Sequence, residues 1–79
     1  MEIKVLGTGC PNCRKTKAVV AEAISALGVD ATIIEVTDIS DIMAYGVMST
    51  PAIVIDETVV GSGGVPTMAQ MTGLIQSAR

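Results

Sequence analysis

The chain has 79 residues, of which 49% are apolar, and a formal net charge of −3 with a sequence pI near 4.5. This length predicts one small domain over residues 1–79, and the acidic balance argues against nucleic acid or an acidic membrane as a partner. The chain has no histidine, one tyrosine and no phenylalanine or tryptophan, so it lacks the usual metal ligand and general base and must build an aliphatic core.

The first half of the chain reads as strand, helix, strand. Glu2 to Leu6 alternates and then runs apolar, which predicts a β-strand. Apolar residues at helical spacing predict a helix from Pro11 to Leu27, with Gly28 as its C-terminal stop. Ala31 to Val36 supplies a second strand. A strand–helix–strand unit of this length predicts two parallel strands joined by a helical crossover.

The second half predicts a short helix, a hairpin and a last helix. The short helix starts at Asp38 and ends at Gly46, and Pro51 precedes a buried strand, residues 52–55. Asp56-Glu57 predicts a turn before a returning strand, residues 58–60. Because glycine is favoured in two-residue type I′ turns, Glu57 favours a wider loop. Residues 61–64 are expected to form a loop, and Pro66 is expected to start the last helix, through Ala78.

Both cysteines of the chain lie in Cys10-Pro11-Asn12-Cys13, directly after Gly7-Thr8-Gly9. Proline suits the first helical position, so Cys10 is expected to be the N-cap and Cys13 the third helical residue. Two thiols on one turn can form a disulfide and reopen it. The unpaired N–H groups of the helix start favour the Cys10 thiolate. We expect Pro11, Asn12 and the basic residues Arg14, Lys15 and Lys17 to tune this thiolate.

The N-terminal residues lack the basic and apolar blocks of a signal peptide, and no apolar run is long enough to span a membrane. These features predict a cytoplasmic protein with no membrane partner. Thiols are kept reduced in a cytosol, so a C-x-x-C pair there indicates a catalytic or metal-binding role. A four-residue loop is also a poor structural staple, because a short closed loop restricts the unfolded chain little.

The order β-α-β-α-β-β-α, with C-x-x-C opening the first helix and Thr50-Pro51 entering the third strand, resembles the thioredoxin-like fold. The likeness is greatest to small glutaredoxin-like redox-active disulfide proteins, and it extends to Ser49-Thr50-Pro51-Ala52 and to Gly63-Gly64 before the last helix. The resemblance implies an α/β fold with a four-stranded mixed sheet, strand order 2-1-3-4, flanked by three helices. It also implies a thiol-disulfide oxidoreductase with no cofactor and no metal.

The family's roles transfer to matching positions. Cys10 would attack a target disulfide, and Cys13, less exposed, would resolve the mixed disulfide and leave a Cys10–Cys13 disulfide. Pro51 would be cis, with Thr50 pairing its backbone with an extended substrate. The partners implied are a disulfide-containing protein and a reductase, such as a thioredoxin-reductase-like donor. The protein itself is expected to be a monomer.

Several residues depart from the family patterns. Glutaredoxins bind the glutathione carboxylate at a Gly-Gly pair followed by an acidic residue, but here Gly63-Gly64 is followed by Val65, which counts against glutathione. Lys4 lies on the first strand where a buried acid is usual in thioredoxins, so no proton acceptor for Cys13 is evident. Tyr45 is expected to be a core aromatic. Four methionines are expected to fill the core rather than bind a metal: Met43, Met48, Met68 and Met71.

Two other functions remain open at this point. The segment from Gly7 to Cys13 is similar to the C-x-x-C loop of copper-carrier domains, and two thiolates suit linear Cu(I). Zinc or an iron–sulfur cluster would need ligands from a second chain. The second of these functions is a non-catalytic interaction domain whose cysteines are incidental.

Overall fold

Four strands form one mixed sheet in the computed structural model, which describes residues 1–78. The strands are β1 (Glu2–Leu6), β2 (Thr32–Val36), β3 (Ala52–Ile55) and β4 (Thr58–Ser62), and their order is β2-β1-β3-β4. β1 pairs parallel with β2 and antiparallel with β3, and β3 pairs antiparallel with β4. This is the mixed sheet and strand order that the sequence predicted.

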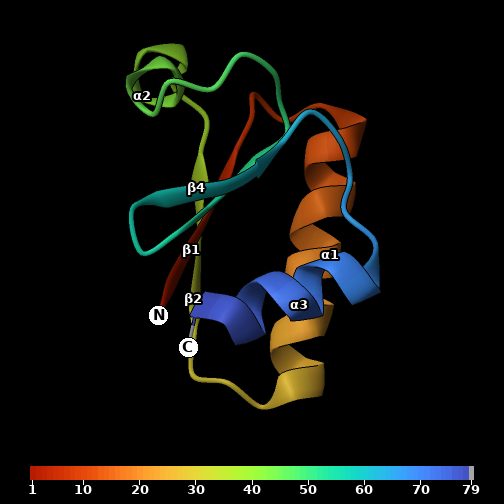
Figure 1. Cartoon of the computed structure of the whole chain (residues 1–79). Coiled ribbons are helices and arrows are strands. Elements are labelled where there is room, and N and C mark those ends of the chain that lie inside the picture. Colours follow the sequence, from red (N-terminus) through yellow and green to blue (C-terminus); the bar gives the residue numbers. More distant parts are fainter. Residues whose placement is uncertain (79) are drawn as a thin grey trace.

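Three helices cover the two faces of the sheet (Figure 1). α1 (Pro11–Leu27) and α3 (Met68–Ala78) contact each other on one face, and the short α2 (Ile39–Ala44) lies on the other. Gly28 ends α1 in the left-handed conformation, and Asp38 caps α2 by accepting the N–H of Ser40 at 2.8 Å. Both helix boundaries agree with the sequence signals.

The alternation of side chains along β1 and β3 builds two cores. The larger core lies under α1 and α3, and its buried residues are Ile3, Val5, Val20, Ala23, Ile53, Ile55, Met71 and Ile75. The smaller core lies under α2, and its buried residues are Leu6, Ile42, Ala52 and Val54. Since neighbouring strand residues point to opposite faces, β1 and β3 each contribute to both cores. The buried residues of these two cores are Ala, Val, Leu, Ile and Met, as the composition predicted.

The C-terminal part of the chain differs from the sequence prediction in two places. Gly61 and Ser62 belong to β4, because they pair with Ile53 and Ala52; the predicted loop therefore begins two residues later. The last helix begins at Met68 rather than at Pro66. Its first turn is closed by a reciprocal pair of hydrogen bonds: Thr67 Oγ1 accepts the N–H of Gln70 at 3.1 Å, and Gln70 Oε1 accepts the N–H of Thr67 at 2.9 Å.

The turn between β3 and β4 has only two residues, so the expectation of a wider loop is wrong. Asp56 and Glu57 adopt φ of 48° and 69°, a left-handed conformation that favours glycine. Asp56 is held by two hydrogen bonds to Glu2, since its N–H donates to the Glu2 carbonyl and its Oδ1 accepts the Glu2 N–H, each at 2.9 Å. These long-range contacts keep the turn tight against β1.

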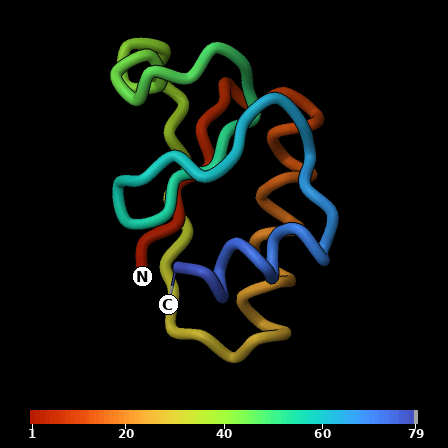
Figure 2. Tube along the Cα trace, viewed as in Figure 1, coloured from red at the N-terminus to blue at the C-terminus, as the bar shows by residue number. Residues whose placement is uncertain are grey.

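The segment that precedes β3 returns to the end of β1 (Figure 2). A Cβ atom on Gly7, just after β1, would lie 4.0 Å from the Cβ of Thr50, just before β3. The fold therefore brings the Gly-rich loop at the start of α1 and the Thr50-Pro51 segment to one end of the sheet. Within residues 1–78, no helix has the length and apolar character needed to cross a membrane.

Candidate functional site

Cys10 and Cys13 form a disulfide on the first turn of α1, with their Cα atoms 5.0 Å apart. Cys10 is the N-cap, Pro11 is the first helical residue and Cys13 the third, as predicted. Cys10 Sγ accepts the N–H of Cys13 at 3.2 Å, and the Cys10 carbonyl accepts the N–H of Arg14 at 3.1 Å. The sulfur of Cys10 thus takes the place of a capping oxygen and lies at the positive end of the helix dipole.

The two sulfur-bearing residues differ in exposure. Cys13 is 6% exposed, whereas Cys10 is half-buried. Cys13 Sγ lies against the backbone of Gly7, where a Cβ atom would overlap with it. Of the two cysteines, Cys10 is therefore the more accessible.

The predicted tuning residues fall into two groups. Pro11, Asn12, Arg14 and Lys15 are exposed on the first turns of α1, and the Asn12 carbonyl accepts a hydrogen bond from Thr16 Oγ1 at 2.8 Å. The first turn contains no acidic residue to offset these cations. Lys17 instead forms an ion pair with Glu35 of β2, with Nζ and Oε1 3.3 Å apart.

Thr50 lies beside Gly7, against which Cys13 packs, and Pro51 contacts Gly63. The Thr50–Pro51 peptide bond is cis; Pro51 is buried and Thr50 is exposed. The Pro51 carbonyl accepts the N–H of Gly63 at 3.0 Å, and a Cβ atom on Gly63 would lie 3.1 Å from Ser49 Oγ. Gly63 is therefore packed against the segment before β3.

Gly63 and Gly64 have different environments. Gly63 has a φ of +87°, whereas a Cβ atom on Gly64 would meet nothing within 4 Å. Both glycines line a cleft of about 600 Å³ between β4 and α3. The first N–H groups of α3 do not directly follow Gly64, because the helix begins at Met68. The start of the helix is capped by Thr67 and Gln70.

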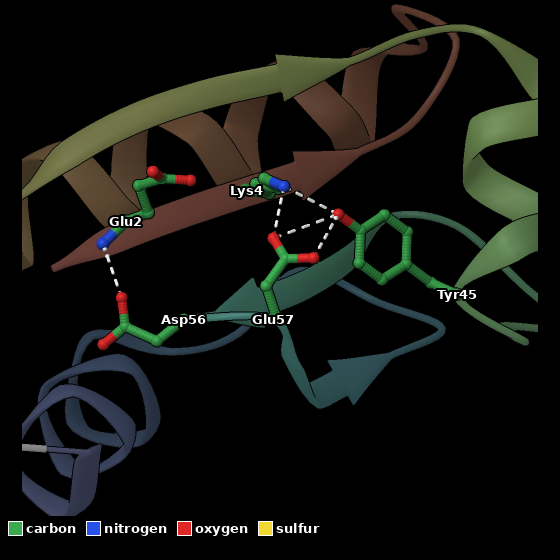
Figure 3. A network of polar contacts seen from close by, with 5 residues as sticks. All are labelled: Glu2, Lys4, Tyr45, Asp56 and Glu57. Carbon is green, nitrogen blue, oxygen red and sulfur yellow. Dashed lines mark hydrogen bonds and ion pairs between the residues drawn. The ribbon is translucent and has the colours of Figure 1, made fainter.

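Lys4, Tyr45 and Glu57 form a polar network on the sheet face that α2 covers (Figure 3). Lys4 Nζ donates to Tyr45 Oη at 2.7 Å and forms a hydrogen-bonded ion pair with Glu57, whose carboxylate also accepts from Tyr45 Oη at 3.3 Å. The hydrogen bonds to Glu57 and Tyr45 raise the pKa of Lys4, and the hydrogen bond from Lys4 lowers the pKa of Glu57. Tyr45 packs against the smaller core, yet its hydroxyl belongs to this network.

The methionine prediction holds in α3 and is wrong elsewhere. Met71 is buried and Met68 packs against the larger core. Met43 and Met48 are 68% and 97% exposed, so they do not fill the core. Among residues 1–78, no group of three or more His, Cys, Asp or Glu side chains is arranged to hold a metal ion.

Two residues near the disulfide escaped the sequence reasoning. Gly7 lies at the end of a strand, six residues before the buried Cys13, and a glycine in such a place is a signal of close backbone approach. Glu35 lines a cavity of about 30 Å³ together with Cys13. No local pattern marks Glu35, because its place depends on the pairing of β2 with β1.

Comparison with known proteins gives two kinds of match. A family model described as a thioredoxin domain matches residues 1–76. A thioredoxin of Methanocaldococcus jannaschii is 36% identical over 75 residues, which cover 95% of this chain and 86% of the relative. A thioredoxin of Methanothermobacter thermautotrophicus is 32% identical over 56 residues, which cover 71% of this chain and 73% of the relative.

Proposed function

The chain belongs to the thioredoxin family and is a thiol-disulfide oxidoreductase, and from this premise we propose that Cys10 is its attacking residue and Cys13 its resolving residue. The difference in exposure supports this order: Cys13 is 6% exposed against the backbone of Gly7, while Cys10 is the more accessible of the pair. A target disulfide can approach Cys10 from solvent, and Cys13 is within reach only of Cys10.

The first step is the attack of the Cys10 thiolate on one sulfur of a target disulfide. The target S–S bond breaks, a bond forms between Cys10 and the target, and the second target sulfur leaves as a thiolate that takes a proton from water. The helix start supports this step, because the backbone N–H of Cys13 and the dipole of α1 stabilise negative charge on Cys10 Sγ. Arg14 and Lys15 add positive charge on the next residues.

The second step closes the disulfide. Cys13 loses its proton to water and attacks Cys10 Sγ; the bond between Cys10 and the target breaks, and the target sulfur leaves as a thiolate. The target has then gained two electrons, and Cys10 and Cys13 have lost two. A reductase must return these electrons, and a reducing cytoplasm is the compartment in which we expect the cycle to run.

Substrate contacts are proposed for Thr50, Pro51, Gly63 and Gly64. Thr50 is exposed beside Gly7, against which Cys13 packs. Pro51 is buried, and its carbonyl accepts the N–H of Gly63, which joins the Gly63-Gly64 loop to this segment. The exposed Thr50, Gly63 and Gly64 would supply the contact surface. An extended protein segment fits such a surface through backbone hydrogen bonds. Glutathione is disfavoured, because the Thr67 N–H at the start of α3 is already bonded to Gln70.

The test combines a turnover assay with trapping. Reduced wild-type protein should lose two thiols and reduce an insulin-type disulfide, with electrons supplied by a dithiol. Cys10→Ser should abolish turnover, while Cys13→Ser should accumulate a stable mixed disulfide through Cys10. Full activity of Cys10→Ser would disprove the assigned order. Tight one-to-one binding of Cu(I) under anaerobic conditions, without any turnover, would favour the copper-carrier alternative instead.

A further inference from the structure

Glu35 lines the same small cavity as the buried Cys13. In the parallel pairing of β1 with β2, Glu35 is the partner of Val5, whose side chain belongs to the core under α1. Partner residues on neighbouring strands point to the same face, so Glu35 faces α1 at the sheet edge. There it lines the cavity of about 30 Å³ that Cys13 also lines. A space of that size holds one or two water molecules.

Lys17 partly balances this carboxylate. Cys13 and Lys17 are four residues apart in α1 and therefore lie on the same face of the helix. Lys17 Nζ lies 3.3 Å from Glu35 Oε1, and both side chains are about half exposed, 48% and 54%. The ion pair is thus screened by water, and neither charge is fully cancelled at the sulfur.

We propose that Glu35 keeps Cys13 in its neutral thiol form in the reduced protein, with Lys17 as the opposing charge. A nearby negative charge disfavours a thiolate and a nearby positive charge favours it. The proposal rests on the function proposed above and deepens it. Cys10 meets the positive end of α1 while Cys13 meets a carboxylate, so the two thiols differ in acidity and only one of them starts the reaction.

The other described residues that line the cavity do not supply a second acidic side chain. Arg14 also lines the cavity and adds a positive charge from α1, and Cys10 is the neighbouring thiol. The other polar or small residues that face Cys13 are uncharged: Gly7, Gly9, Thr37 and Thr50. Among the described residues that line the cavity, Glu35 is thus the source of negative charge.

The resolving step is where this charge acts. The Cys13 thiol gives its proton to water, its thiolate attacks Cys10 Sγ, and the target sulfur leaves as a thiolate. Because only the thiolate attacks, the rate follows the fraction of Cys13 that is ionised. Removal of the Glu35 charge should increase that fraction and speed the step, and removal of the Lys17 charge should slow it.

The experiment follows reduced protein with a chromogenic aromatic disulfide, which releases one coloured thiolate at each step. The first phase reports the attack of Cys10 and the second the attack of Cys13. Glu35→Gln should accelerate the second phase about threefold at neutral pH and lower its pH midpoint by about half a unit, the size expected for one screened charge. Lys17→Gln should shift both quantities in the opposite direction.

Two controls separate charge from structure. The variant carrying both substitutions should return close to wild type, and Glu22→Gln should change nothing, because Glu22 is exposed on α1 nine residues, about 13.5 Å, beyond Cys13. If the two substitutions acted by weakening the structure, Glu35→Gln and Lys17→Gln would change the rate of the second phase in the same direction. That result would overturn the proposal. A slower second phase in Glu35→Gln would also overturn it and would make Glu35 a proton acceptor. Absence of the first phase in wild type would refute the proposed function instead.

Discussion

Cys13 Sγ and the backbone of Gly7 are in such close contact that no side chain fits between them. Gly7 follows β1, and its N–H donates to the Val36 carbonyl of β2 at 2.9 Å, so its position is fixed by the sheet. Cys13 is fixed by the first turn of α1. The contact therefore sets the distance between the sheet and the disulfide.

Gly7→Ala should destabilise the oxidised protein. The new Cβ atom would overlap with Cys13 Sγ and lie 3.1 Å from Cys13 Cβ, so α1 or the sheet must shift. Overpacking of this kind costs about 1–3 kcal/mol, measurable by urea unfolding. Gly73→Ala is the control: a Cβ atom there meets nothing within 4 Å, and alanine should stabilise α3 by about 0.5–1 kcal/mol. Equal stability of Gly7→Ala and wild type would contradict the contact.

Gly63 and Gly64 should respond differently to the same substitution. Gly63→Ala places a side chain at a φ of +87° and 3.1 Å from Ser49 Oγ, so a loss of about 1–2 kcal/mol is expected in the free energy of unfolding. Gly64→Ala meets open space without a left-handed φ and should be neutral. Equal free energies of unfolding for the two variants would show that the packing of Gly63 against the segment before β3 does not stabilise the fold.

Thr67→Ala should weaken the start of α3. It removes the Oγ1 that accepts the Gln70 N–H, and loss of a side-chain N-cap costs about 1 kcal/mol. Thr72→Ala is the matched control, because within residues 1–78 its Oγ1 bonds only to the carbonyls of Met68 and Ala69 inside the helix, and alanine is the better helix former. A lower free energy of unfolding in urea for Thr72→Ala than for Thr67→Ala would refute the role of Thr67 as the cap of α3.

The sequence predicts the elements and their order because the patterns that encode them are local. The alternation in Glu2–Leu6, the helical spacing from Pro11 to Leu27 and the cysteines at the helix start each depend on neighbouring residues. The extent of β4 is different. Gly61 and Ser62 have low strand propensity and extend only because β3 pairs with them, and this tertiary contact outweighs their local preference.

The site is likewise predictable from the sequence only where local patterns encode it. Cys10 as N-cap follows from its position before Pro11, and the cap of α3 could have been found from the spacing of Thr67 and Gln70. The proximity of Glu35 to Cys13 could not, since it depends on the register of two parallel strands. The exposure of Met48 likewise depends on how the chain after α2 returns to β3.

The β3–β4 turn shows how distant contacts permit an unfavoured backbone. A left-handed conformation costs a non-glycine residue about 1–2 kcal/mol, and both residues of this turn adopt one. Asp56 is bonded to Glu2, and Glu57 forms its ion pair with Lys4 of β1 (Figure 3). The turn residues thus contact two positions of β1, and the stability of the hairpin should depend on the charge of Glu57.

Glu57→Gln should reduce stability at neutral pH and have no effect in acid. The ion pair with Lys4 lowers the pKa of Glu57 below its ordinary 4.5, so its contribution is present above that value and is lost as the pH falls through the lowered pKa. The raised pKa of Lys4 keeps its own contribution until the pH passes above 10.5. Urea unfolding of wild type and Glu57→Gln should therefore converge below pH 4.5. The control Glu22→Gln, whose carboxylate makes no ion pair within residues 1–78, should show no such convergence, and a constant difference for Glu57→Gln at every pH would contradict the assignment.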